Sequence, residues 1–194
     1  MTTSAVIPRI ENALKQWIDP YLQTDLLTAG CLRRVHVDKG NAQIDIQLGY
    51  PAAGFIDEMV SSIRDTVLQQ VTELNAVDVN IHWQIEAHSI ASKTAPMRRV
   101  SNIIAIASGK GGVGKSTTAA NLALALTAEG ARVGLLDADI YGPSLPLMMG
   151  VAPDTRPETR DQKYFVPIQA HGVQLMSMGV LVTESTPVVW RGPM

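Results

Sequence analysis

The residues best suited to chemistry lie in one glycine-rich stretch, SGKGGVGKSTT, at residues 108–118. Gly109, Gly111 and Gly114 satisfy G-x-G-x-x-G, a pattern typical of loops that bind a dinucleotide. With the lysine and serine that follow, the same stretch satisfies G-x-x-x-x-G-K-[ST], which is typical of loops that bind a nucleoside triphosphate. The two patterns predict different ligands, so other residues must decide between them.

Three features favour the triphosphate. Lys115 and Ser116 supply a charge for the terminal phosphates and a hydroxyl for Mg²⁺, neither of which a pyrophosphate needs. Lys110 adds a second cation inside the loop. Asp137 and Asp139 place two carboxylates after the next predicted strand, which suits a magnesium shell or the positioning of a water. One acid near that place would also suit the ribose of a dinucleotide, so that interpretation stays open, as does a glycine turn without a ligand.

The elements around the stretch form the pattern of a strand–helix–strand unit. Residues 102–107 are a short apolar run, typical of a buried parallel strand. Residues 116–129 are rich in good helix formers, and Gly130 ends the predicted helix. Residues 132–136 predict a second buried strand. A right-handed crossover is therefore expected between the two strands.

The first part of the chain predicts a separate α+β unit. Residues 8–18 predict a short helix, and residues 35–48 predict a hairpin that turns at the sequence DKGN. Residues 55–74 carry a helical apolar stripe, and apolar and polar residues alternate over 77–85, as in a half-buried strand.

Composition divides the chain into a small α+β domain at 1–86, a linker at 87–99 and a second domain at 100–194. The linker is rich in small and polar residues and shows no period. Only two strands are predicted for the second domain, so we expect exposed apolar surface there and marginal stability on its own. Residues 1–86 are expected to fold independently.

Composition also bounds the function. The chain of 194 residues is 46% hydrophobic, which is enough for a packed core. Its formal net charge of −2 gives no electrostatic case for binding nucleic acid. We recognise no membrane span and no secretory signal. A single cysteine, Cys31, excludes an internal disulfide, and a cytoplasmic location is expected.

Several stretches resemble one known family. GKGGVGKST, with Lys110 ahead of Lys115, resembles the deviant Walker A loop of the MinD/ArsA-type ATPases. GLLDADIYGPS at 134–144, VVWRGPM at 188–194 and the small first domain narrow the resemblance to the Mrp/ApbC iron–sulfur cluster carrier ATPases. The fold class implied is α/β, with a small N-terminal α+β iron–sulfur-assembly-type domain before an incomplete P-loop NTPase parallel-sheet domain.

The resemblance implies a function and its cofactors. Members bind ATP with Mg²⁺, hydrolyse it slowly and form a homodimer across the nucleotide. They hold a [4Fe–4S] cluster transiently and transfer it to apoproteins, and iron–sulfur scaffold proteins are further expected partners. Neither nucleic acid nor a membrane is expected as a partner.

The resemblance also implies site residues, carried over by position. Lys110, Lys115 and Asp139 would be catalytic: Lys110 would reach the nucleotide of the partner subunit, Lys115 would bind the β and γ phosphates, and Asp139 would position the attacking water. Ser116 would bind Mg²⁺, and Asp137 would support it. The residues expected to contact ATP are Ser108, Gly109, Lys110, Gly111, Gly112, Val113, Gly114, Lys115, Ser116 and Thr117, with Thr117 near the α phosphate.

Two family motifs are expected downstream of VVWRGPM, an Asp-x-Pro-Pro-Gly motif and a Cys-x-x-Cys pair that holds the cluster, and this sequence contains neither. We therefore expect the chain to correspond to the N-terminal half of a carrier, without cluster cysteines. Cys31 is expected to be a small buried residue, and His36 and His82 to face solvent. Two alternatives remain: a non-catalytic interaction module, or another MinD/ParA-type regulatory ATPase.

Overall fold

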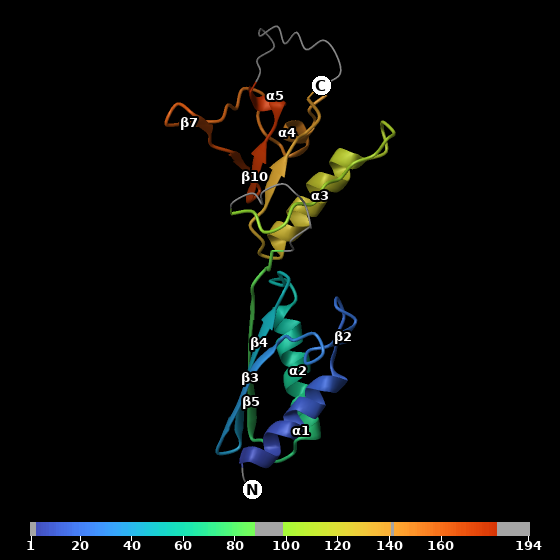
Figure 1. The fold of residues 1–194 in the computed structure, drawn as a ribbon, viewed down its shortest axis with the longest axis vertical. Helices are drawn as coiled ribbons and strands as arrows, with labels where there is room; N and C mark the ends of the chain where they lie inside the picture. Colours follow the sequence, from blue (N-terminus) through green and yellow to red (C-terminus); the bar gives the residue numbers. More distant parts are fainter. Residues whose placement is uncertain (1–2, 88–98, 141, 182–194) are drawn as a thin grey trace. The chain divides into compact units, whose positions relative to one another are not determined.

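The computed structural model describes residues 3–87, 99–140 and 142–181 of the chain (Figure 1). Contacts within the chain divide it into two units, Met1–Ile103 and Ile104–Met194. Most of the predicted linker, together with His88 and the VVWRGPM stretch, lies outside the described residues. No helix among the described residues is long and apolar enough to cross a membrane.

Unit 1 is a three-stranded sheet covered on one face by two helices. Its elements are α1 (Thr3–Gln16), β1 (Ile18–Asp19), β2 (Thr24–Asp25), β3 (Leu32–Asp38), β4 (Asn41–Leu48), α2 (Ile56–Gln70) and β5 (Ala76–Trp83). The sheet has the order β3-β4-β5, with β3 antiparallel and β5 parallel to β4. The predicted hairpin is confirmed: Asp38 pairs with Asn41, and Lys39 and Gly40 between them have the positive φ values that a two-residue hairpin turn requires.

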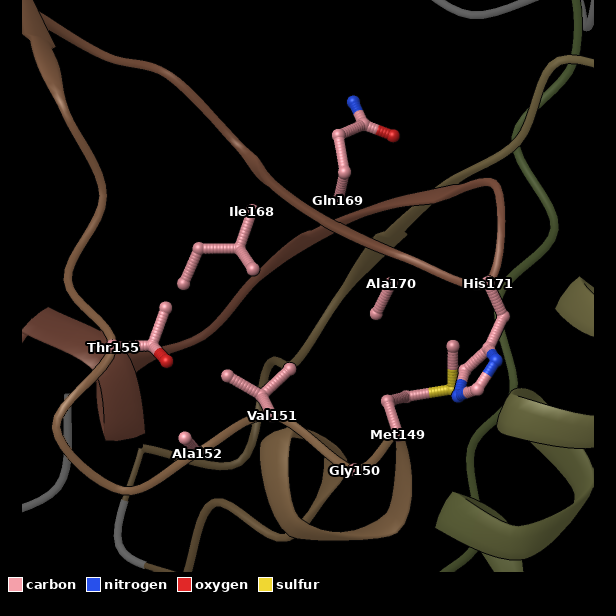
Figure 2. Close-up of a pocket in the computed structure, with 9 residues that line it drawn as sticks. All are labelled: Met149, Gly150, Val151, Ala152, Thr155, Ile168, Gln169, Ala170 and His171. Carbon is pink, nitrogen blue, oxygen red and sulfur yellow. The ribbon is translucent and has the colours of Figure 1, made fainter.

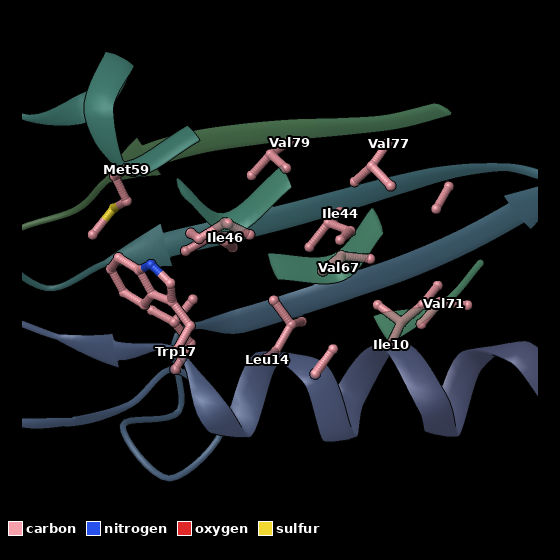
Figure 3. Close-up of a cluster of buried hydrophobic side chains, with 14 of the residues drawn as sticks. Ile10, Leu14, Trp17, Ile44, Ile46, Met59, Val67, Val71, Val77 and Val79 are labelled. Atoms are coloured by element: carbon pink, nitrogen blue, oxygen red, sulfur yellow. The ribbon is translucent and has the colours of Figure 1, made fainter. Parts of the chain in front are cut away.

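The core of unit 1 lies between this sheet and the two helices (Figure 3). Side chains that alternate along β4 point toward the helices, among them Ile44 and Ile46, which are fully buried. Leu14 of α1 and Val67 of α2 meet them from the helical side. The four-residue spacing of Ile10 and Leu14 explains why α1 packs with one face, since residues four apart share a face of a helix.

The boundaries of the predicted elements in unit 1 differ from the structure by a few residues. The first helix begins at Thr3 instead of residue 8, because Val6 also lies on the buried face and adds a turn before Pro8. It ends at Gln16, and the Trp17 indole N–H donates to Ser62 Oγ of α2 at 2.9 Å. The last strand ends at Trp83, and Ile85 beyond it is partly exposed.

Unit 2 contains one long helix and a small sheet. Its elements are α3 (Lys115–Ala128), β6 (Gly134–Leu136), α4 (Leu145–Met148), β7 (Thr159–Arg160), β8 (Tyr164–Phe165), β9 (Ile168–Ala170), β10 (Val173–Met176) and α5 (Met178–Leu181). The sheet has the order β6-β10-β9, with β10 parallel to β6 and antiparallel to β9, while β7 and β8 pair separately. Ala120, Ala123, Leu145, Met149, Val173 and Leu175 form its core.

The prediction of a strand at residues 102–107 is wrong. These residues belong to no strand, and Ile103 and Ile104 are 67% and 63% exposed. Among the described residues β6 pairs only with β10, so the predicted strand–helix–strand crossover is not formed. The physical reason is that a strand needs a neighbouring backbone to satisfy its N–H and C=O groups, and no described strand pairs with residues 102–107.

The second predicted strand of this part is present as β6, but it is not buried on both faces. Leu136 is 71% exposed, and Ile104 of the same unit is 63% exposed. This matches the exposure expected from the small number of strands in the second domain.

Candidate functional site

The glycine-rich stretch forms a loop that leads directly into α3. Gly112 has a φ of +71°, and Gly114, the N-cap of α3, has a φ of +88°. Only glycine adopts this left-handed conformation without strain, so the backbone itself requires glycine at these two positions. Gly109 and Gly111 have no positive φ, and a Cβ added to either would meet nothing within 4 Å. The loop therefore has open space beside the backbone at both positions. A ligand that approaches the backbone closely needs such space.

The backbone N–H groups of this loop are available to a ligand. Lys110 N–H donates to Ser108 Oγ at 3.1 Å, and the first helical bond runs from Thr118 N–H to Gly114 O at 2.9 Å. Between them, the N–H groups of residues 111–117 have no hydrogen-bond partner among the described residues. The first turn of α3 holds no acidic residue and no side-chain cap. A helix N-terminus in this state attracts an anion through its free N–H groups and its dipole.

The side chains of the loop add two cations and two hydroxyls. Lys115 is half-buried, and its Nζ donates to Lys110 O at 3.4 Å, so its ammonium group lies back over the loop. Ser116 is half-buried and Thr117 is exposed at the first turn of α3. Lys110 is exposed. A phosphate bound by the free N–H groups would therefore have an ammonium group and hydroxyls at the same end of the helix.

The two predicted aspartates lie at the carboxyl end of β6 and differ in environment. Asp137 is buried: its Oδ1 accepts the N–H of Asp139 at 3.0 Å, and its Oδ2 accepts the N–H of Leu145 at 3.2 Å and the hydroxyl of Ser177 at 3.4 Å. Asp139 is exposed, and its Oδ1 accepts the N–H of Gly142 at 3.0 Å. Asp137 thus stabilises the segment after β6 through its hydrogen bonds, while Asp139 faces solvent.

The fold brings the loop and the aspartates to the same end of unit 2. α3 and β6 run in opposite directions and are joined by residues 129–133, so the start of α3 and the end of β6 lie on one side (Figure 1). No hydrogen bond or ion pair joins the loop to Asp137 or Asp139 in the described part of the chain. The oxygen donors that Ser116 and the two carboxylates provide are those Mg²⁺ prefers, so the residues present fit that ion.

Sequence reasoning missed Ser177 and the N–H of Leu145 as partners of Asp137. A usable signal exists for Ser177. It follows β10, which lies parallel to β6 with Met176 opposite Leu136, so Ser177 and Asp137 both come directly after paired strands. Polar residues at the carboxyl ends of neighbouring parallel strands meet at the same edge of a sheet. The pairing of β6 with β10 was not predicted, so the signal could not be used.

The other candidate residues do not form a second chemical site. Cys31 is 4% exposed, as expected, and burial, followed by the charge of Asp19, raises the pKa of its thiol while Arg33 opposes the rise. His36 and His82 are exposed on the sheet of unit 1, as predicted. Among the described residues no three His, Cys, Asp or Glu side chains are grouped as a metal site would need.

Unit 2 also has an open pocket beside α4 and the β9–β10 hairpin (Figure 2). His171 and Met149 are both among the side chains that line it. His171 is the one titratable side chain in a lining that is otherwise apolar or neutral. None of the loop residues lines the pocket, and the lining offers no group that would select a triphosphate.

Comparison with known proteins assigns a family to each part of the chain. Residues 8–81 match the family described as iron–sulfur cluster assembly protein. Residues 99–194 match the family described as NUBPL iron-transfer P-loop NTPase. The two matched ranges coincide with the parts of the chain that hold the small sheet and the glycine-rich loop.

Curated relatives match across both parts. An iron–sulfur cluster carrier protein of Salmonella typhimurium is 51% identical over 186 residues, which cover 95% of this chain and 50% of the relative. One of Escherichia coli is 40% identical over 190 residues, covering 95% and 50%. One of Pseudomonas fragi is 60% identical over 121 residues, covering 62% and 42%. The chain spans about half the length of the curated relatives it matches.

Proposed function

We propose that this chain binds ATP at the glycine-rich loop of residues 108–118. The chain belongs to the Mrp/ApbC family of iron–sulfur cluster carrier P-loop NTPases. The family matches and the curated relatives confirm the resemblance predicted from the sequence. They also confirm the mixed α/β class, with an iron–sulfur-assembly-type domain before a P-loop NTPase domain. The observation that supports ATP binding best is the run of unpartnered N–H groups at the start of α3, next to Lys115.

The proposed binding mode follows from these groups. The N–H groups of residues 111–117 bind the phosphates, and Lys115 Nζ moves from Lys110 O to the β and γ phosphates. Ser116 would hold Mg²⁺ with support from Asp137, and the ion would supply positive charge beside the phosphates. Asp139, exposed near the end of β6, orients the attacking water. Lys110 reaches the nucleotide of a partner subunit in a homodimer.

The wider role is part of the same proposal. The relatives are named iron–sulfur cluster carrier proteins, and we propose that this chain serves the transfer of such clusters to apoprotein clients in the cytoplasm, with scaffold proteins as further partners. We assign no residue of this chain to the cluster, because its one cysteine, Cys31, is buried and its thiol has a raised pKa.

The loss of binding in Lys115→Ala tests the proposal. A calorimetric titration of the full chain with Mg-ATP should show saturable binding. Lys115→Ala should raise the dissociation constant by about ten- to a hundredfold, as expected for the loss of a charge-assisted contact. Lys163→Ala removes an exposed lysine of the same unit and serves as the matched control. If the native chain does not bind, or binds as tightly with Ala at position 115, a non-catalytic interaction module becomes the better account.

A further inference from the structure

Neither edge strand of the sheet in unit 1 pairs on its outer side with another described strand, and β5 is the longer and more regular of the two. β5 has eight residues and is the last strand in the order β3-β4-β5 (Figure 1). No described strand pairs with its outer edge. A free edge of this length carries a row of N–H and C=O groups that can pair with another strand.

The direction of these groups follows from two hydrogen bonds. The N–H of Gln84, just after β5, donates to Leu48 O of β4 at 2.9 Å, so the backbone groups of even-numbered residues face β4. The groups of odd-numbered residues face outward, because they alternate along a strand. Arg64 Nε of α2 donates to Val77 O at 3.1 Å, which agrees with this assignment. The outward groups belong to Val77, Val79, Ile81 and Trp83.

We propose that this edge is a self-association surface, at which the β5 strands of two copies of the chain pair antiparallel about a two-fold axis at Asn80. In this register Asp78 lies opposite His82 of the partner subunit, and the reverse pair follows by symmetry. Asp78, Asn80 and His82 are all exposed on the polar face of the sheet. The imidazole N–H of His82 donates to the Asp78 carboxylate, and such cross-strand pairs stabilise a sheet.

The register is set by charge and by the alternation of the strand. If one β5 strand slipped by one residue along the other, its outward N–H groups would no longer face the acceptors of the partner strand. The polar face of one sheet would then continue into the apolar face of the other. A slip by two residues would place Asn80 opposite Asp78 or His82 and would lose both Asp–His pairs. The two-fold register at Asn80 is the one that keeps both.

Half-buried apolar side chains on the other face give the contact a second component. Ile81 and Trp83 are only partly covered within unit 1. Val60 and Leu68 of α2 are also half-buried, and they lie one helical turn to either side of Arg64, which reaches the edge of β5. A second copy would cover these side chains. Arg64 need not leave Val77 O, because a carbonyl oxygen has two lone pairs.

Cysteine cross-linking of the full chain tests this pairing. At a non-hydrogen-bonded antiparallel pair the two Cα atoms are about 4.5 Å apart, within the range of a disulfide, so Asn80→Cys should give a covalent dimer on mild oxidation. Gln43→Cys, exposed on the same face of the central strand β4, would be about 20 Å from its copy and should not. The native Cys31 is buried. A folded Asn80→Cys chain that stays monomeric, or equal cross-linking of both variants, would overturn the proposal.

A charge swap provides an independent test without oxidation. His82→Asp places carboxylates opposite each other, and the dimer dissociation constant from sedimentation equilibrium without nucleotide should rise by about two- to tenfold. Asp78→His combined with His82→Asp restores the pairs and should restore the affinity. Unchanged association in His82→Asp would contradict the register. Both results should hold in a Lys115→Ala background, which separates this surface from nucleotide binding.

Discussion

Asp19 shows how a single residue organises the end of unit 1. It is fully buried, and its Oδ1 accepts the N–H groups of Tyr21 at 2.8 Å and Leu22 at 3.0 Å. Its Oδ2 accepts the hydroxyl of Tyr50, whose ring contacts Tyr21 edge to face. Burial, followed by the hydrogen bond to Asp19, raises the pKa of Tyr50 well above its usual value.

This arrangement predicts a loss of stability at alkaline pH. The unfolded chain releases the Tyr50 proton near pH 10, but the folded chain retains it to higher pH, so the free energy of unfolding falls above about pH 10, by at most about 1.4 kcal/mol per pH unit because solvent screens a partly exposed ring. Below that pH the contribution is fully present. Denaturant titrations between about pH 9 and 12 should show this slope, and Tyr50→Phe should flatten it. Tyr164→Phe, at an exposed ring of unit 2, is the control, and an equal slope in Tyr50→Phe would contradict the prediction.

Among single residues, the sequence predicts best those whose requirement is local. The loop glycines and Lys115 could be located because a phosphate loop is contiguous in the chain. Asp19 was not recognised as a buried acceptor, because its partner Tyr50 lies 31 residues away and their contact depends on the packed fold. Ser177 was missed for the same reason, being 40 residues from Asp137.

At the scale of elements, Asp137 holds together the ends of β6, β10 and α4. Asp137→Ala would leave the N–H groups of Asp139 and Leu145 and the Ser177 hydroxyl without this acceptor. We expect it to lower the free energy of unfolding of unit 2 by about 1–3 kcal/mol, measured by urea denaturation without nucleotide. Asp137→Asn keeps one acceptor oxygen and should lose less.

Ser177→Ala is the comparison variant, because it leaves both backbone donors of Asp137 paired and removes only side-chain contacts of Ser177: its 3.4 Å contact to Asp137 and the 3.0 Å bond that its Oγ accepts from the Gly179 N–H. It should cost less than Asp137→Ala. Equal stability of the native chain and Asp137→Ala would show that the carboxylate does not fasten these elements.

Elements with local signals were predicted well, and elements that need a distant neighbour were not. The turn at Lys39-Gly40 and the helices α2 and α3 follow from turn residues and apolar periodicity. Residues 102–107 have the composition of a buried strand, but Ile103 and Ile104 are exposed since no described strand pairs with them. Apolar composition favours burial, whereas strand formation depends on the partner.

At the scale of the whole molecule, the two units differ in how completely their apolar residues are covered. The core of unit 1 includes fully buried side chains from both helices and the sheet, such as Leu14, Ile44 and Ile63. In unit 2 Leu136 and Leu147 are 71% and 81% exposed. Native-state hydrogen exchange should therefore give higher protection in β3, β4, β5 and α2 than in β6, β10 and α3. Equal protection in both units would contradict this difference and the domain division expected from the sequence.

The same exchange measurement, repeated with Mg-ATP, tests the central claim most directly. If the glycine-rich loop binds the triphosphate through its N–H groups, the amides of residues 111–117 and the first turns of α3 should become protected, with little change in unit 1. Lys115→Ala should reduce that protection, and Lys163→Ala should not. Unchanged exchange at residues 111–117 at saturating Mg-ATP would contradict nucleotide binding at this loop.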